Sequence, residues 1–205
     1  MEKQTARFEA FSDGIFGVAI TLLAIEIGIQ EYEGANNLNL WHKILEKGPE
    51  YFTFFNSFAT ILLIWMGHNK IINQIKKVNH WLILLNGLLL LFVVLFPFPT
   101  RMVGNFIGTD AQNTAVSFYV GFTGMISLCM LLLNVCIINN KNLMISPEKS
   151  MPWFKNMMRG QVFGIIIYAI AAIIAFYYPA IALLISFAMW VFWAIVSKDN
   201  DEELV

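Results

Sequence analysis

Charged residues are scarce in this chain. Asp, Glu, Lys and Arg make up 13% of its 205 residues, whereas 58% of the residues are hydrophobic. A soluble domain commonly carries about 25% charged residues, so water is not the expected solvent of this protein. The formal net charge of −1 argues against electrostatic binding of nucleic acid, because such binding needs clustered cationic side chains. We therefore expect the lipid bilayer as the environment and no nucleic acid as a partner.

Cysteine is also scarce, since the chain contains only Cys129 and Cys136, seven residues apart in one apolar stretch. On a helix they would share a face about two turns apart and could not reach each other. The histidines His42, His68 and His80 show no metal-ligand spacing. We expect no disulfide, no metal site, no cofactor and no enzymatic centre.

Long apolar runs are the dominant feature of the sequence. A hydrocarbon core of roughly 30 Å needs about 20 helical residues, and continuous runs favour helices over the alternating strands of a membrane barrel. The predicted fold is all-α, a polytopic membrane protein with six transmembrane helices in a single domain over residues 1–205. The six segments run approximately over residues 8–29, 51–72, 80–98, 115–138, 160–178 and 180–197. A polar stretch with aromatic residues, 146–155, predicts an interfacial connector before the fifth helix.

Lys and Arg are distributed unevenly between alternate connections. If the N-terminus is cytoplasmic, ten of these residues lie inside and only Lys43, Lys47 and Arg101 lie outside. The excess of cations on the inner side predicts a multi-pass protein of the cell membrane with both termini in the cytoplasm.

The first segment has two stripes that differ in side-chain size. At about 100° per residue, one stripe is branched and aliphatic, and its neighbour is small at every position, which permits close approach of another helix. The aliphatic stripe is Val18, Leu22, Ile25 and Ile29, and the small stripe is Gly14, Gly17, Thr21, Ala24 and Gly28. On spacing alone, the aliphatic stripe favours ordinary helix packing or lipid contact.

Asp13 is the unusual residue of this segment. Ionisable residues inside membrane segments are costly and commonly functional. Together with Ser12, it points away from the aliphatic stripe, so both side chains are expected to meet other helices. The alternative is an Asp13 that is simply hydrated near the inner interface.

Residues 7–23, with the sequence RFEAFSDGIFGVAITLL, resemble the signature first helix of the transmembrane protein 175 family of potassium channels. The triplet Phe11, Ser12 and Asp13 is the family's hallmark, and the Pro-Phe-Pro-Thr sequence at 97–100 is similar to a secondary motif. The diagnostic motif occupies only the first helix, although the helix count agrees along the whole chain. A single six-helix set resembles the bacterial members, which assemble as tetramers.

The resemblance implies a potassium-preferring cation channel in which four first helices surround a central pore. It places a hydrophobic constriction at Val18, Leu22 and Ile25, and links Thr21 to potassium preference. Family members commonly have isoleucine where this chain has Val18, so the narrowest point is either wider or displaced to Leu22. The expected partners are further copies of the chain and monovalent cations, with potassium as the permeant ion.

The family also implies a polar network that supports the motif, because a desolvated Asp13 needs hydrogen-bond donors. The candidate donors are Trp65 and His68 on the second segment, Asn86 on the third, and Arg7. Since Arg7 and Asp13 do not share a helix face, any pairing between them should involve another helix or subunit.

Two other function classes stay open. A secondary transporter of a monovalent cation or proton would also place charge in the membrane, but transporters commonly show broken helices or inverted repeats, and neither is visible. A non-conducting membrane scaffold would leave the motif without an explanation.

Overall fold

The computed structural model of the protein describes residues 2–25, 27 and 36–202, and its regular structure is helical throughout. The predicted all-α fold is therefore confirmed. The helices are α1 (Glu2–Ile25), α2 (Asn37–Glu46), α3 (Gly48–Ile72), α4 (His80–Leu95), α5 (Pro97–Phe106), α6 (Gln112–Asn139), a short 3₁₀ turn (Lys141–Leu143), α7 (Pro147–Ala175) and α8 (Pro179–Glu202).

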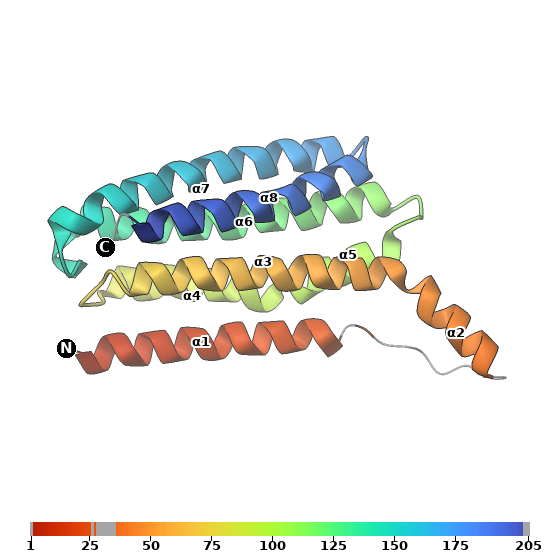
Figure 1. Ribbon diagram of the computed structural model, residues 1–205, viewed down its shortest axis with the longest axis horizontal. Helices are drawn as coiled ribbons and strands as arrows, with labels where there is room; N and C mark the ends of the chain where they lie inside the picture. The colour runs from red at the N-terminus through yellow and green to blue at the C-terminus, as the bar shows by residue number, and fades with distance from the viewer. Residues whose placement is uncertain (1, 26, 28–35, 203–205) are drawn as a thin grey trace.

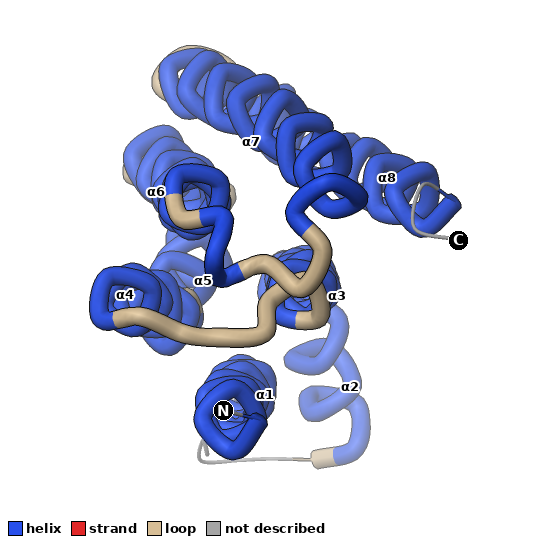
Figure 2. Tube along the Cα trace, turned by 90° about the vertical axis from the view of Figure 1, so that its left-hand side faces the viewer, coloured by secondary structure: helices blue, strands red, loops and turns tan. Residues whose placement is uncertain are grey.

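The helices form a bundle with α1 at one side and α7 and α8 at the other (Figure 2). Helix α1 packs against α3 and α4 and touches α5. The N-terminal end of α1 and the C-terminal end of α8 lie at the same end of the bundle (Figure 1). Because its neighbours all lie on one side, α1 keeps a long face uncovered.

Five helical spans are long and apolar enough to cross a membrane. They are Thr5–Ile25, His80–Phe106, Gln112–Asn139, Pro147–Ala175 and Pro179–Val196. Helix α3 has 25 residues and lies within the bundle, but it is more polar, and its Asn56, Ser57 and His68 are buried. Length and composition thus support five of the six predicted spans, whereas α3 falls outside this set.

Several segment boundaries differ from the prediction. The third segment does not run unbroken to residue 98, because α4 ends at Leu95 and Pro97 opens α5. Proline lacks a backbone N–H, so it is readily accommodated in the first turn of a helix and tends to kink or interrupt the helix further along. The predicted connector at 146–155 is also wrong, since α7 already begins at Pro147. The end of the first predicted segment, including Gly28 and Ile29, lies outside the described residues.

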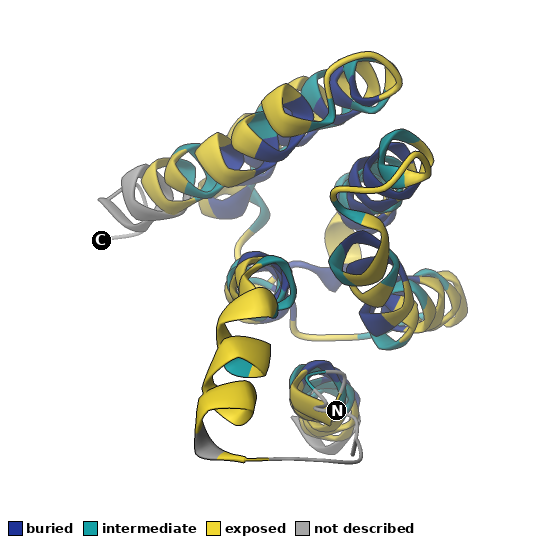
Figure 3. Cartoon of the chain, turned by 90° about the vertical axis from the view of Figure 1, so that its right-hand side faces the viewer, coloured by how far each residue is buried: buried dark blue, intermediate teal, exposed yellow. Residues whose placement is uncertain are grey.

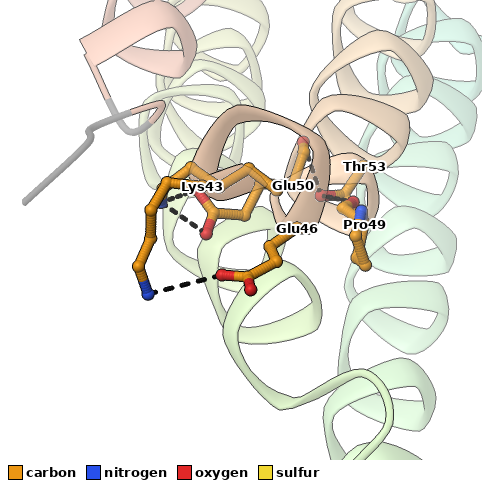
Figure 4. Close-up of polar contacts among 6 residues, drawn as sticks. Lys43, Glu46, Pro49, Glu50 and Thr53 are labelled. Carbon is orange, nitrogen blue, oxygen red and sulfur yellow. Dashed lines mark hydrogen bonds and ion pairs between the residues drawn. The ribbon is translucent and has the colours of Figure 1, made fainter. Parts of the chain in front are cut away.

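A short helix that the sequence did not predict, α2, leads into α3 through a corner fixed by local polar contacts. Lys47 Nζ donates to both carboxylate oxygens of Glu50 at 2.7 Å. Figure 4 shows the neighbouring ion pair of Lys43 and Glu46, whose N–O distance is 3.3 Å. The side chain of Asn36 caps the first turn of α2. Of these contacts, only the Lys47–Glu50 pair lies at the junction of α2 and α3.

The contact between α7 and α8 depends on a glycine. A Cβ atom at Gly164 would lie 2.8 Å from Cζ2 of the Trp193 ring. One turn earlier, a Cβ at Gly160 would lie 3.5 Å from Cγ1 of Val196, an ordinary van der Waals distance. Small residues four apart let two membrane helices approach closely, so Gly164 sets the closest approach of the pair.

The substitution Gly164→Ala is expected to lower the thermal unfolding midpoint of the detergent-solubilised protein. The added methyl group must displace the Trp193 ring, and overpacking of this kind costs about 1–3 kcal/mol. The matched control is Gly160→Ala, which should leave the midpoint unchanged or raise it, because its Cβ fits and alanine favours helix. Equal midpoints for the two variants would contradict this account.

Candidate functional site

The face of α1 that packs on the bundle is apolar except at one residue. Phe8, Phe16, Ala19 and Leu23 are buried at spacings of three, four or eight residues, which is the periodicity of one helix face. Ser12 lies among them with its side chain fully buried. A buried hydroxyl without partners is costly, so Ser12 marks the point where α1 needs polar contacts from its neighbours.

A chain of hydrogen bonds supplies these contacts. Asn86 Nδ2 on α4 donates to Ser12 Oγ at 2.9 Å, and Ser12 Oγ donates to the Phe8 carbonyl oxygen at 2.9 Å. His68 Nε2 on α3 lies 2.8 Å from Asn86 Oδ1 and donates to it, because an amide oxygen only accepts. Both ends of the Asn86 amide are therefore used. We call Ser12, Asp13, Trp65, His68 and Asn86 the anchor network.

Asp13 joins the anchor network from the flank of α1. Trp65 Nε1 on α3 donates to Asp13 Oδ1 at 2.8 Å. The His68 ring also packs against the Phe16 ring, with 5.4 Å between the ring centroids. Two neighbouring helices thus hold α1 through directional contacts, which determine its rotation about its own axis.

The structure brings together most of the residues proposed for the motif, with two exceptions. Ser12, Asp13, Trp65, His68 and Asn86 meet as described, whereas Phe11 and Arg7 are exposed and lie outside the network. Within the described residues, Arg7 shows no hydrogen bond or ion pair. A pairing of Arg7 with another subunit stays a prediction.

The described members of the aliphatic and small stripes, up to Ile25, lie away from the buried face of α1. Val18 is 53% exposed and Ile25 is 73% exposed, while Leu22 is half-buried. Figure 3 shows exposed residues along α1 on the side away from the bundle. A Cβ atom added at Gly14 or Gly17 would meet nothing within 4 Å. The close helix contact predicted for the small stripe is therefore not made within the described part of the chain.

Exposure of apolar side chains does not by itself distinguish a pore from a lipid contact. Ile173 on α7 and Leu184 on α8 are exposed to similar extents, 64% and 66%. Helix α1 differs from α7 and α8 because the anchor network holds one of its faces against the bundle. This fixes the rotation of α1 and leaves Val18 and Ile25 uncovered. The pore-lining roles of Val18, Leu22, Ile25 and Thr21 stay predictions.

A second buried polar cluster was not predicted from the sequence. Asn56 Nδ2 donates to the Tyr119 hydroxyl at 2.8 Å, and the hydroxyl oxygens of Ser57 and Thr100 lie 2.7 Å apart. These bonds tie α3 to α5 and α6, so Thr100 of the Pro-Phe-Pro-Thr motif has a structural partner. Polar residues inside the apolar segments were the available signal, but the sequence does not say which of them meet.

Among the described residues, no three His, Cys, Asp or Glu side chains gather in a way that could hold a metal ion. The chemistry of this region is therefore that of hydrogen bonding and apolar surface. A polytopic helical membrane protein with one rigidly anchored, half-uncovered helix is the class that the fold and the site define.

Comparison with known proteins finds similarity to one family of membrane channels. The profile of the family described as "Endosomal/lysosomal potassium channel TMEM175" matches residues 7–97. A curated protein of Chamaesiphon minutus named a potassium channel is 37% identical over 120 residues, which are 58% of this chain and 59% of that protein. A Bos taurus protein named an endosomal/lysosomal proton channel is 32% identical over 106 residues, 49% of this chain and 22% of that protein.

A solved structure extends the similarity over nearly the whole chain. The crystal structure described as a lysosomal potassium-selective channel TMEM175 homolog from Chamaesiphon minutus superposes with a TM-score of 0.85 at 28% sequence identity. The match covers 95% of this chain and 98% of that one. The chain is thus similar to proteins of the TMEM175 family, and in sequence it spans somewhat more than half the length of the curated bacterial relative it matches. The names of these relatives describe channels and not enzymes.

Proposed function

We propose that the protein is a potassium-preferring channel of the cell membrane, in which four subunits surround a pore lined by α1. The observation that carries the proposal is that Val18 and Ile25 are exposed on α1, about a third of a turn around the helix from its buried face, with Leu22 half-buried in the same stripe. The anchor network keeps that stripe turned outward from its own subunit. In the proposed assembly, further copies of the chain cover this stripe, and the α1 helices of four copies surround a central pore axis.

In this arrangement α3 is the sixth membrane span. Its 25 residues correspond to roughly 37 Å of helix at about 1.5 Å per residue, which is enough to cross the hydrocarbon core. Its buried groups Asn56 Nδ2 and His68 Nε2 are acceptable there, because Tyr119 and Asn86 on other helices accept their hydrogen bonds. Both termini are proposed to face the cytoplasm.

The proposed constriction selects ions without a carbonyl filter. Rings of aliphatic side chains at Val18, Leu22 and Ile25 force a passing cation to lose part of its hydration shell, which favours the more weakly hydrated potassium ion over sodium. The Thr21 hydroxyl donates its proton to the Val18 carbonyl oxygen at 2.8 Å. Its oxygen therefore remains an acceptor beside the constriction. The selectivity is expected to be modest, and no cofactor is required.

The test is ion flux through proteoliposomes that contain the purified protein. Under a potassium gradient, the protein should pass potassium passively at high turnover and faster than sodium. Empty liposomes are the control, and a proton-sensitive dye reports any proton permeation. A saturable flux that requires a counter-ion would favour a transporter, and the absence of any cation flux from folded, oligomeric protein would favour a scaffold.

A further inference from the structure

A cavity of about 330 Å³ lies at the seam between α7 and α8. Its lining residues come from both helices and are Asn156, Arg159, Gly160, Phe163, Phe192 and Val196. Arg159 is exposed and Phe163 is 48% exposed, so the cavity opens on the outer surface of the bundle. Helices α7 and α8 lie at the opposite side of the bundle from α1 (Figure 2), so this opening is remote from the proposed pore.

Arg159 is the charged side chain of this cavity. Within the described residues, its guanidinium group makes no hydrogen bond or ion pair. Lys155 precedes it by one turn of α7 and is exposed, and its side chain also makes no such contact there. Residues four apart lie on one helix face, so the two cations stand together. An anion is the complementary ligand, and the planar guanidinium group matches the oxygens of a phosphate group in particular.

One wall of the cavity is aromatic. The Phe163 ring of α7 and the Phe192 ring of α8 meet across the seam, with 5.1 Å between their centroids. Gly160 adds no side chain to the lining, and Val196 adds a branched aliphatic one. This part of the cavity offers only hydrocarbon, so a ligand that fills the cavity needs an apolar part beside its anionic group.

The charged and aromatic parts lie at different depths along the membrane spans. The chain turns between α7 and α8 at Tyr177 and Tyr178, which are both exposed, as is common for aromatic residues at a membrane interface. Measured from the helix ends at that turn, at about 1.5 Å per residue, Arg159 lies roughly 24 Å away, and Phe163 and Phe192 lie roughly 18–20 Å away. In a hydrocarbon core of roughly 30 Å, the rings are thus at the depth of lipid tails, and the long arginine side chain reaches the headgroups beyond.

We propose that this cavity binds an anionic phospholipid, with its phosphate on Arg159 and the start of an acyl chain against Phe163 and Phe192. A free phosphate ion would leave the aromatic wall bare, and a zwitterionic lipid carries its own cation, which Arg159 and Lys155 repel. The proposal needs the chain to span a membrane and does not depend on ion conduction. In the proposed orientation the site faces the cytoplasmic leaflet, the side on which basic pockets between membrane helices commonly bind anionic headgroups.

The test is native mass spectrometry of the full-length, detergent-solubilised protein, titrated with dioleoylphosphatidylglycerol or with dioleoylphosphatidylcholine. The two lipids share their tails and differ in net charge. Wild type should bind the first phosphatidylglycerol molecule per subunit more tightly than phosphatidylcholine. Arg159→Gln should weaken binding of phosphatidylglycerol about tenfold, the size expected for one charge-assisted hydrogen bond, and leave binding of phosphatidylcholine unchanged.

The matched control is Lys141→Gln, which removes one positive charge at an exposed position outside the cavity and should bind both lipids as wild type does. Equal affinity of wild type for the two lipids, or an unchanged affinity in Arg159→Gln, would overturn the proposal. Equal weakening by Arg159→Gln and Lys141→Gln would also overturn it, because a general attraction between cations and anionic lipid explains that result. Displacement of the bound lipid by inorganic phosphate would make this a site for a free anion instead.

Discussion

Asn86→Leu is expected to release α1 from the bundle and to destabilise the folded protein by about 2–5 kcal/mol. Leucine has the same number of side-chain heavy atoms and the same branching as asparagine, although it is bulkier, and it cannot donate to Ser12 or accept from His68. Both of these partners are buried, so neither can turn to water. Each buried polar group left without a hydrogen-bond partner then lowers the free energy of unfolding by roughly 1–3 kcal/mol.

The consequence extends beyond one subunit if α1 lines the interface between copies. If α1 can rotate about its own axis, it no longer presents Val18 and Ile25 to a neighbouring subunit. The oligomer should then dissociate at concentrations where wild type remains assembled. Thermal unfolding followed by tryptophan fluorescence and light scattering after gel filtration measure the two effects.

The matched control is Asn105→Leu, the same change at an exposed position on α5. It should alter neither the unfolding midpoint nor the assembly. If Asn86→Leu kept the wild-type midpoint and mass, the anchor network would not be what fixes α1.

Leu22→Ala is expected to raise potassium flux and to weaken the preference for potassium over sodium. The truncation removes three carbon atoms per subunit at the proposed constriction, so an ion retains more of its hydration shell as it passes. A barrier lowered by about 1.4 kcal/mol would raise the flux about tenfold. Ile25→Ala should act in the same direction, one turn further along α1.

The control for this prediction is Leu184→Ala, an identical truncation at an exposed position on α8. Because α8 lies at the opposite side of the bundle from α1 (Figure 2), its flux and ion preference should match those of wild type. Proteoliposome flux under paired potassium and sodium gradients measures both variants. Equal effects of the two truncations would show that the change acts through general loosening of the protein and not through a pore.

The overall class of the protein follows from local properties of the chain. Apolar runs of about 20 residues require helices in lipid, because no water is present to satisfy the backbone. Periodicity within the first helix separates Ser12 and Asp13 from Val18, Leu22 and Ile25, whatever the helix packs against. Boundaries were less predictable, since α7 begins with a polar turn at Pro147 that composition alone assigns to a connector.

The partners of each face were decided only by the tertiary structure. Trp65 and Asp13 are 52 residues apart in the chain, and Asn86 and Ser12 are 74 apart, so no local pattern pairs them. The sequence determined that α1 has a polar side and an aliphatic side. Packing against α3 and α4 determined which side is buried, because only there do the buried polar groups find donors and acceptors.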